Sequence, residues 1–247
     1  MYIDVSNLPR QCQLENGKKM KKTIVLSHPK LAESAVQSFL LEGLNWLDAG
    51  VNIIKLDQKF LRSTLSLAEQ RELILNSAEV FLQFPLYWYS APASLAQWQE
   101  ELFTDKFVHE LQEKNKVQPA MLAAVISMAD KSADFGAGAR IGRTISELLS
   151  PFQAFAEKVG FSYRKPFIIE QFNYQTPKQQ ERTLIEYLMY IADADASFEQ
   201  RSEWLLAQLT KIEQTANSAI LRDYLQQQLD EYRLLDATLG EIKNDRE

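Results

Sequence analysis

Five short apolar runs, separated by segments with helical periodicity, organise the chain between residues 23 and 192. The runs are continuous rather than alternating in polarity, which is typical of parallel strands covered on both faces. This repetition of strand and helix favours the α/β class over an all-helical or all-strand fold. The five predicted strands are Thr23–Leu26, Val51–Leu56, Val80–Phe84, Met121–Ile126 and Phe167–Ile169.

Amphipathic segments lie between the predicted strands. Apolar residues recur at spacings of three and four within residues 36–47, and residues 93–103 and 146–158 show the same pattern. Thr176-Pro177 predicts a further helix with proline at its first position. Strand–helix units with right-handed crossovers build a doubly wound sheet rather than a barrel at this length. We therefore predict an α/β fold with a doubly wound, five-stranded parallel sheet in the order 2-1-3-4-5.

The character of the sequence changes at Asp193. Two stretches follow in which apolar residues recur at helical spacing among glutamine, glutamate and arginine. They predict a C-terminal helical extension, a hairpin over residues 193–247, appended to an α/β domain of residues 20–192. Its apolar stripes must be buried against that domain or against a second subunit. The stripes are Phe198, Leu205, Leu209 and Ile212, and then Leu221, Leu225, Leu229, Tyr232 and Leu235.

The first 19 residues are polar and lack the apolar centre of a secretory signal. We expect residues 1–19 to form a poorly ordered extension before a domain that begins at Met20. The only cysteine of the sequence is Cys12, and it lies in this extension. A single cysteine excludes an internal disulfide and a cysteine metal cluster, and it fits a reducing cytoplasm. A net charge of −6 disfavours nucleic acid as a partner. No apolar run approaches the roughly 20 residues that span a bilayer.

Ligands of doubly wound sheets bind beyond the carboxyl ends of the strands. The loop after the first predicted strand contains His28 and Lys30 and leads into a helix near Ser34. Free N–H groups at a helix N-terminus, a serine hydroxyl and nearby positive charge suit a phosphate group. Ser34 could equally be an ordinary N-cap and His28 a turn residue, and the residues alone favour neither reading.

The loop after the third predicted strand is more distinctive. It runs from Gln83 to Pro92, and two prolines bracket the consecutive aromatics Tyr87, Trp88 and Tyr89. A loop restrained by proline can present flat aromatic surface and backbone amides at the ligand edge of the sheet, which suits a planar ring. The alternative is that the aromatics pack the domain or a dimer face. Three in a row on such a loop favour the binding site.

This loop also carries a family resemblance. The segment Gln83–Trp98 resembles the flavin-binding segment of the flavodoxin-like NAD(P)H:quinone oxidoreductases, a family that includes the ancillary proteins of glutathione-gated potassium efflux. The spacing from His28-Pro29 to Ser34 is similar to that of the family's phosphate loop. Glu147–Phe152 and Gly160–Phe167 resemble its later portion, so that the similarity extends over about two thirds of the chain.

The resemblance implies a flavodoxin-like fold that binds FMN or FAD and transfers hydride from NAD(P)H through the flavin to a quinone. Hydride chemistry belongs to the flavin, so no catalytic side chain and no metal site are expected. The family also implies a homodimer. The residues implied to bind the cofactor are His28, Ser34 and Gln37 for the phosphate, Pro85, Leu86, Tyr87, Trp88 and Tyr89 for the ring, and Ser127, Met128, Ala129 and Asp130 for its other side.

Three segments depart from the family pattern. Gln37 stands where the family has asparagine, Ser127–Asp130 replaces a loop of threonine and glycine, and Phe103–His109 lacks the expected glycines. Asp130 adds a negative charge where the family has a small residue. These departures support an alternative: a non-catalytic regulatory subunit with a degenerate flavin site, docked on a membrane transporter at the inner face of the membrane or on another partner.

Overall fold

A computed structural model describes residues 21–47, 51–56, 65–192, 198–209, 226–227, 229–235 and 237–238. The predictions for residues 1–19 and Cys12 lie outside the described residues. The chain divides into two compact units. The first contains residues 1–34 and 48–172, and the second contains residues 35–47 and 173–247.

The first unit is built on a parallel sheet of five strands. Its order, β2-β1-β3-β4-β5, confirms the predicted doubly wound topology. All five strands contain the apolar runs expected from the sequence, and β3 and β5 begin earlier than those runs do. The strands are β1 (Lys21–Ser27), β2 (Val51–Leu56), β3 (Ser77–Pro85), β4 (Met121–Met128) and β5 (Ser162–Glu170).

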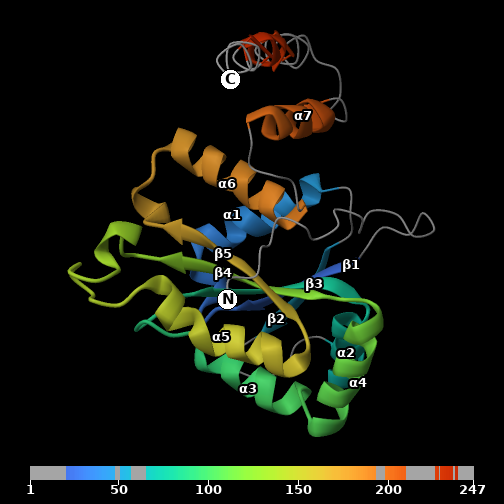
Figure 1. Cartoon of the computed structure of the whole chain (residues 1–247). Helices are drawn as coiled ribbons and strands as arrows, with labels where there is room; N and C mark the ends of the chain where they lie inside the picture. Colours follow the sequence, from blue (N-terminus) through green and yellow to red (C-terminus); the bar gives the residue numbers. More distant parts are fainter. Residues whose placement is uncertain are drawn as a thin grey trace, which may run out of the picture. The chain divides into compact units, whose positions relative to one another are not determined.

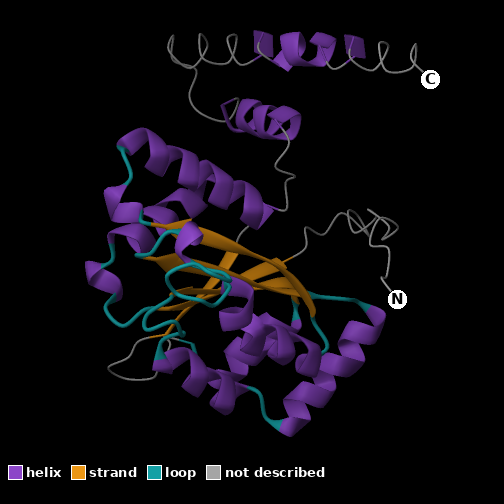
Figure 2. Cartoon of the chain, turned by 60° about the vertical axis from the view of Figure 1, so that its left-hand side comes forward, coloured by secondary structure: helices purple, strands orange, loops and turns teal. Residues whose placement is uncertain are grey.

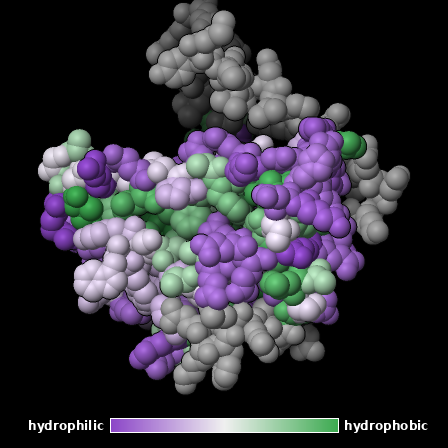
Figure 3. All heavy atoms as spheres, turned by 90° about the horizontal axis from the view of Figure 1, so that it is seen from below, coloured by the Kyte–Doolittle hydropathy of each residue, from purple (hydrophilic) through white to green (hydrophobic). Residues whose placement is uncertain are grey.

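Four helices of this unit lie below the sheet in the view of Figure 1. They are α2 (Leu67–Leu75), α3 (Ala93–Leu102), α4 (Asp105–Val117) and α5 (Ile145–Val159). Their outer surface is largely hydrophilic, and hydrophobic residues show between the hydrophilic areas (Figure 3). The helices therefore present one apolar face to the sheet and a polar face to water, as amphipathic helices of a globular domain do.

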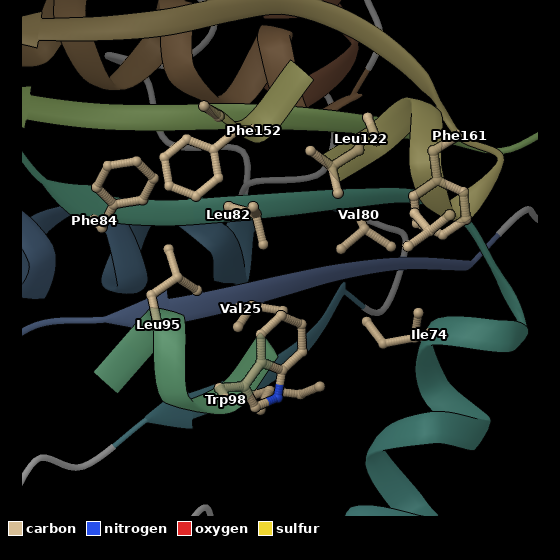
Figure 4. Packing of buried hydrophobic residues seen from close by; sticks show 14 of the residues in the cluster. Val25, Ile74, Val80, Leu82, Phe84, Leu95, Trp98, Leu122, Phe152 and Phe161 are labelled. Atoms are coloured by element: carbon tan, nitrogen blue, oxygen red, sulfur yellow. The ribbon is translucent and has the colours of Figure 1, made fainter. Parts of the chain in front are cut away.

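The main core lies between the sheet and these helices. Phe84 and Leu82 of β3 face Phe152 of α5 and Trp98 of α3 (Figure 4). The rings of Phe84 and Phe152 have centroids 5.1 Å apart. Nε1 of Trp98 donates a hydrogen bond of 2.8 Å to Oε1 of Gln70, so the one polar atom of this indole is satisfied inside the core.

Local sequence signals set several helix ends. Capping boxes begin α2 at Ser66 with Glu69, and α5 at Thr144 with Glu147. Gly160 ends α5 in the left-handed conformation, at φ +81°, which a residue without a side chain adopts at little cost. Such caps satisfy backbone groups that the helix itself leaves unpaired.

The second unit is helical. It contains α1 (Ala35–Gly43), α6 (Pro177–Ala192) and α7 (Phe198–Leu209). Gly43 lets α1 and α6 approach closely, since a Cβ at this position would lie 2.3 Å from Cδ1 of Leu184. Arg233 donates to Glu199 at 2.7 Å and also pairs with Glu203, which links residues 229–235 to α7.

The predicted hairpin of residues 193–247 is only partly within the described residues. Ile212, Leu221 and Leu225, which belong to its predicted stripes, lie outside them. Leu229 is buried. None of the helices in the described part of the chain has the length and apolar character that would let it cross a membrane.

Short 3-10 turns complete the connections. One of them, η2 (Leu31–Glu33), lies between β1 and α1. Another, η4 (Ser132–Asp134), follows β4, and η5 (Phe172–Tyr174) follows β5. All three come after the carboxyl end of a strand, which is the edge at which a doubly wound sheet binds its ligands.

Candidate functional site

Loops gather at one edge of the sheet (Figure 2). The loop after β1 turns back on itself at His28, which is buried. Nδ1 of His28 accepts a hydrogen bond of 3.0 Å from the backbone N–H of Lys30. The ammonium group of Lys30 lies 3.2 Å from Glu33, and both side chains are exposed. The positive charge of Lys30 therefore already has a partner on its own loop.

Ser34 comes directly before α1 and is buried, with an extended backbone at φ −91° and ψ 102°. Its backbone N–H donates to the carbonyl of Leu31 at 3.1 Å. Gln37 is buried on α1, within the second unit. The order predicted from the sequence, a loop that ends at Ser34 and then a helix, is the order that the structure shows.

The aromatic loop after β3 makes a tight turn. Trp88 and Tyr89 both have positive φ, 53° and 60°, and Tyr87 and Ser90 on either side of them form an antiparallel bridge. This is the geometry of a type I′ turn, whose two central positions favour asparagine and glycine. Aromatic residues there are strained by about 1–3 kcal/mol each. The turn exposes 95% of the Trp88 side chain to solvent.

Both neighbouring strand ends hold the aromatic loop in place. The backbone N–H of Leu86 donates a hydrogen bond of 2.8 Å to the carbonyl of Ser127, near the end of the neighbouring strand β4. From the β1 side, Oη of Tyr87 lies 3.4 Å from Nε2 of His28. The two rings meet edge to face with centroids 5.9 Å apart. The predicted residues His28 and Tyr87 are thus in contact although 59 positions separate them.

A further link at this edge was not predicted from the sequence. Oγ of Ser27, the last residue of β1, lies 2.8 Å from Oγ of Ser94 in the first turn of α3, and both hydroxyls are buried. Two serines in an ordinary polar context carry no signal of this pairing, because nothing marks residues so distant as neighbours. The link fixes the start of α3 beside the first loop.

The loop after β4 begins with buried residues and ends in charged ones. Ser127 and Met128 are buried at the end of the strand, whereas Ala129 is exposed. Asp130 accepts a hydrogen bond of 2.5 Å from Nη2 of Arg140, and the same nitrogen lies 3.4 Å from Oδ2 of Asp134. One guanidinium thus serves two carboxylates.

Residues 131–144 fold into a closed loop. The backbone N–H of Ile141 donates to the carbonyl of Asp134 at 3.0 Å, and that of Gly136 donates to Arg143 at 2.9 Å. Phe135 within this loop meets Tyr89 edge to face, with centroids 6.5 Å apart. Phe135 lies in the candidate site but was not predicted from the sequence; its position directly before a glycine in a glycine-rich loop was the available signal.

Burial and charge set the protonation of this edge. Burial lowers the pKa of His28 below its ordinary value, which keeps the imidazole neutral near pH 7. Hydrogen bonds to Asp130 and Asp134 raise the pKa of Arg140. The backbone N–H of Lys131 holds the pKa of Asp134 below its usual value. The loop after β1 is therefore uncharged at His28, whereas the loop after β4 carries a cluster of paired charges.

The arrangement suits a flat ligand. Loops from β1, β3 and β4 meet through the His28–Tyr87, Leu86–Ser127 and Tyr89–Phe135 contacts. The exposed indole of Trp88 lies between half-exposed tyrosines, an aromatic surface on which a planar ring can stack. Among the described residues, no three histidine, cysteine, aspartate or glutamate side chains group as a metal site would require.

Two curated relatives are each similar to more than half of this chain. The uncharacterized NAD(P)H oxidoreductase YrkL of Bacillus subtilis (strain 168) is 28% identical over 148 residues, which are 60% of this chain and 84% of YrkL. The glutathione-regulated potassium-efflux system ancillary protein KefF of Enterobacter sp. (strain 638) is 27% identical over 144 residues, 58% of this chain and 80% of KefF.

Two solved structures share the fold. An NADPH-quinone reductase of P. pentosaceus is 34% identical, covers 70% of this chain and 98% of its own, and superposes with a TM-score of 0.61. General stress protein 14 of Treponema denticola, solved in complex with FMN, is 23% identical over 70% of this chain and 98% of its own, with a TM-score of 0.59.

The family model Flavodoxin_2, described as a flavodoxin-like fold, matches residues 20–191. These residues include all five strands and the three loops described above. The matched segment ends before α7, so the C-terminal helices are additional to the family's shared fold. The chain belongs to the Flavodoxin_2 family, the family that its aromatic loop and strand order indicate.

Proposed function

We propose that the chain is a flavin-dependent NAD(P)H oxidoreductase that passes two electrons from NAD(P)H to a quinone. The observation that carries this proposal is the strained turn at Trp88 and Tyr89, which presents aromatic surface where the loops after β1, β3 and β4 meet. Strained residues persist where the surrounding structure enforces them and cluster at ligand sites. The 34% identity to an NADPH-quinone reductase supports the reaction class.

The cofactor we propose is FMN, the flavin of the relative from Treponema denticola, with FAD as the alternative. When bound, the flavin accepts a hydride from the nicotinamide and passes the electrons to the acceptor. In this proposal Ser34 binds the phosphate. Its place at the end of the loop after β1, at the edge where a doubly wound sheet binds its ligands, supports this role.

The aromatic loop and the loop after β4 hold the ring in this proposal. Pro85 and Leu86 shape the rim at the end of β3, while Tyr87, Trp88 and Tyr89 stack on or border the ring. Ser127, Met128, Ala129 and Asp130 close its other side. The Asp130–Arg140 pair favours this arrangement, since a paired carboxylate opposes an anionic reduced flavin less than a lone one does.

A homodimer in the cytoplasm completes the proposal. A nearly fully exposed tryptophan beside two half-exposed tyrosines is apolar surface that a second subunit could cover. The scarcity of cysteine fits a reducing compartment. Light scattering of the purified protein tests the dimer, and a monomer at micromolar concentration contradicts it.

The visible spectrum of the purified protein tests the flavin directly. We expect flavin bands in the protein as purified or after addition of FMN, bleaching by NAD(P)H without oxygen, and recovery of the bands on addition of a quinone. Trp88→Ala should weaken FMN binding about ten-fold through lost stacking, without unfolding the chain. Val117→Ala, a similarly exposed apolar residue at the end of α4, is the control. A colourless protein that binds neither FMN nor FAD contradicts the proposal.

The second candidate is a regulatory subunit that docks on a membrane transporter. The similarity to KefF, an ancillary protein of a potassium-efflux system, favours it. Under this proposal the protein lies at the inner face of the membrane and need not turn over NAD(P)H. Co-purification of a potassium-efflux transporter with the tagged chain, together with a failure to bind flavin, supports it over the oxidoreductase.

A further inference from the structure

His28 uses both of its ring nitrogens within the protein. Nδ1 accepts the backbone N–H of Lys30 at 3.0 Å, and Nε2 lies 3.4 Å from Oη of Tyr87. The ring is buried and meets the edge of the Tyr87 ring at an interplanar angle of 69°. A histidine that served as a phosphate ligand would direct one of these nitrogens to the anion.

The contact with Lys30 fixes the tautomer. A backbone amide can only donate, so Nδ1 must present its lone pair, and the neutral ring must carry its proton on Nε2. Nε2 then donates to Oη of Tyr87 over 3.4 Å, which is longer than the usual range of about 2.7–3.2 Å and makes this a weak hydrogen bond. Burial, which disfavours the charged ring, keeps this neutral form in place near pH 7.

We infer that His28 is a positioning residue for ring recognition: as the Nε2–H tautomer it fixes Tyr87 and hence the strained turn at Trp88 and Tyr89. This inference rests on the proposed flavin function and deepens it. His28 lies in the loop expected to bind phosphate, yet its side chain acts on the loop expected to bind the ring.

The geometry of the turn explains why such support is needed. Tyr87 is the first residue of the bridge that closes the turn, so its position sets the direction of the two strained residues after it. The Leu86–Ser127 hydrogen bond holds only the base of the loop. Tyr87 is half exposed, and its contact with His28 ties its hydroxyl end to the loop after β1. Phe135 meets Tyr89 on the other side of the turn.

Two flavins and two variants test the inference. Riboflavin has the ring of FMN without the phosphate. His28→Asn keeps an acceptor for the Lys30 amide but is too short to reach Tyr87, and Tyr87→Phe removes only the hydroxyl. We expect each variant to weaken the binding of FMN and the binding of riboflavin by the same factor, about five-fold, as for one lost hydrogen bond. The double variant should bind each flavin no more weakly than the single variants do, because both changes remove the same contact.

Titration calorimetry gives these affinities, and the opposite pattern overturns the inference. His28 is a phosphate ligand if His28→Asn weakens the binding of FMN but not of riboflavin, and if Tyr87→Phe changes the affinity for neither flavin. If the unaltered protein binds neither flavin, the proposed function fails. The side-chain geometry then remains open to a test that needs no flavin.

Nitrogen NMR of the imidazoles supplies that test. The chain has two histidines, His28 and the exposed His109 on α4, so the signals are readily assigned by substitution. We expect His28 to show a protonated Nε2 and an unprotonated Nδ1 at pH 7, and its Nε2 shift to change in Tyr87→Phe. His109 serves as the internal reference and should not respond. A protonated Nδ1 at His28, or a signal indifferent to Tyr87→Phe, overturns the inference.

Discussion

Arg140 holds Asp130 by a hydrogen bond of 2.5 Å between Nη2 and Oδ1. The same guanidinium lies 3.4 Å from Asp134, so the two carboxylates of this loop share one cation. The sequence alone indicates a negative charge at position 130, beside the proposed ring. The structure adds the compensating charge, which comes from ten residues further along the chain.

This pairing predicts that substitutions of Arg140 and of Asp130 have opposite effects on a bound flavin. Arg140→Gln leaves Asp130 without its cation and should lower the flavin reduction potential. Asp130→Asn leaves the cation and should raise it, and Asp130→Gly should raise it too. All three shifts should be small, because the groups are partly exposed and solvent screens them. A redox titration measures them. Shifts in the same direction, or none, would mean that this loop faces away from the ring.

A buried carboxylate near the amino end of β3, Glu79, predicts a substitution with a large effect on stability. Glu79 of β3 is 2% exposed and lies 3.1 Å from Lys22 of β1 and 2.6 Å from Arg164 of β5. Glu79→Gln removes the charge that both cations share, and breaking such a buried pair costs about 3–5 kcal/mol. Urea unfolding measures the loss. The control is Glu33→Gln, whose pair with Lys30 is about 70% exposed and should contribute less than about 1 kcal/mol.

The same residues show how far the sequence predicts the fold. Apolar runs identify all five strands, because strands covered on both faces are apolar. Their order in the sheet follows from the doubly wound topology expected for such strand–helix units. The runs place the starts of β3 and β5 too late, at Val80 and Phe167 rather than at Ser77 and Ser162. The added residues include Glu79 and Arg164, which are polar and pair with each other although 85 positions separate them. Periodicity cannot reveal such long-range pairing.

The candidate site is predictable to a similar extent. Proline and aromatic residues mark the loop after β3, and the spacing from His28 to Ser34 marks the loop after β1. The sequence does not show that His28 contacts Tyr87 or that Arg140 pairs with Asp130, since both depend on how loops turn in space. Helix α4 was not predicted from the sequence either, because its buried face consists of only three residues, Phe107, Leu111 and Asn115.

An unsatisfied hydroxyl predicts a stabilising substitution. Within the described part of the chain, Oη of Tyr163 on β5 is buried and makes no hydrogen bond. Burial also raises the pKa of this tyrosine to about 12. Tyr163→Phe removes a buried polar group that lost its water on folding, and should raise the free energy of unfolding by about 1 kcal/mol. Tyr174→Phe, at an exposed tyrosine, should change nothing measurable. A loss of stability in Tyr163→Phe would reveal a partner for the hydroxyl.

The C-terminal residues are expected to govern association. Leu234 and Leu235 are largely exposed on the helical segment 229–235, which lies outside the family's matched residues. Removal of residues 193–247 should leave the sheet folded and change the oligomeric state or solubility, because apolar helical surface is lost or uncovered. Circular dichroism checks the fold and light scattering checks association. An unchanged oligomer with unchanged solubility would show that the segment is an independent appendage.

The buried His28 predicts a change of stability with pH. Burial lowers its pKa in the folded protein below the ordinary 6.5 that applies to the unfolded chain. Between those two values the unfolded chain binds more protons than the folded protein, so the free energy of unfolding falls as pH falls through this window. His28→Asn removes the titrating group and should flatten the profile as pH falls below the ordinary pKa of 6.5, even if the variant is less stable throughout. His109→Asn, at the exposed histidine of α4, is the matched control variant. Urea unfolding at several pH values measures each profile. An unchanged slope in His28→Asn would mean that His28 is as easily protonated in the folded protein as in the unfolded chain, which the buried Nδ1 contact with Lys30 argues against.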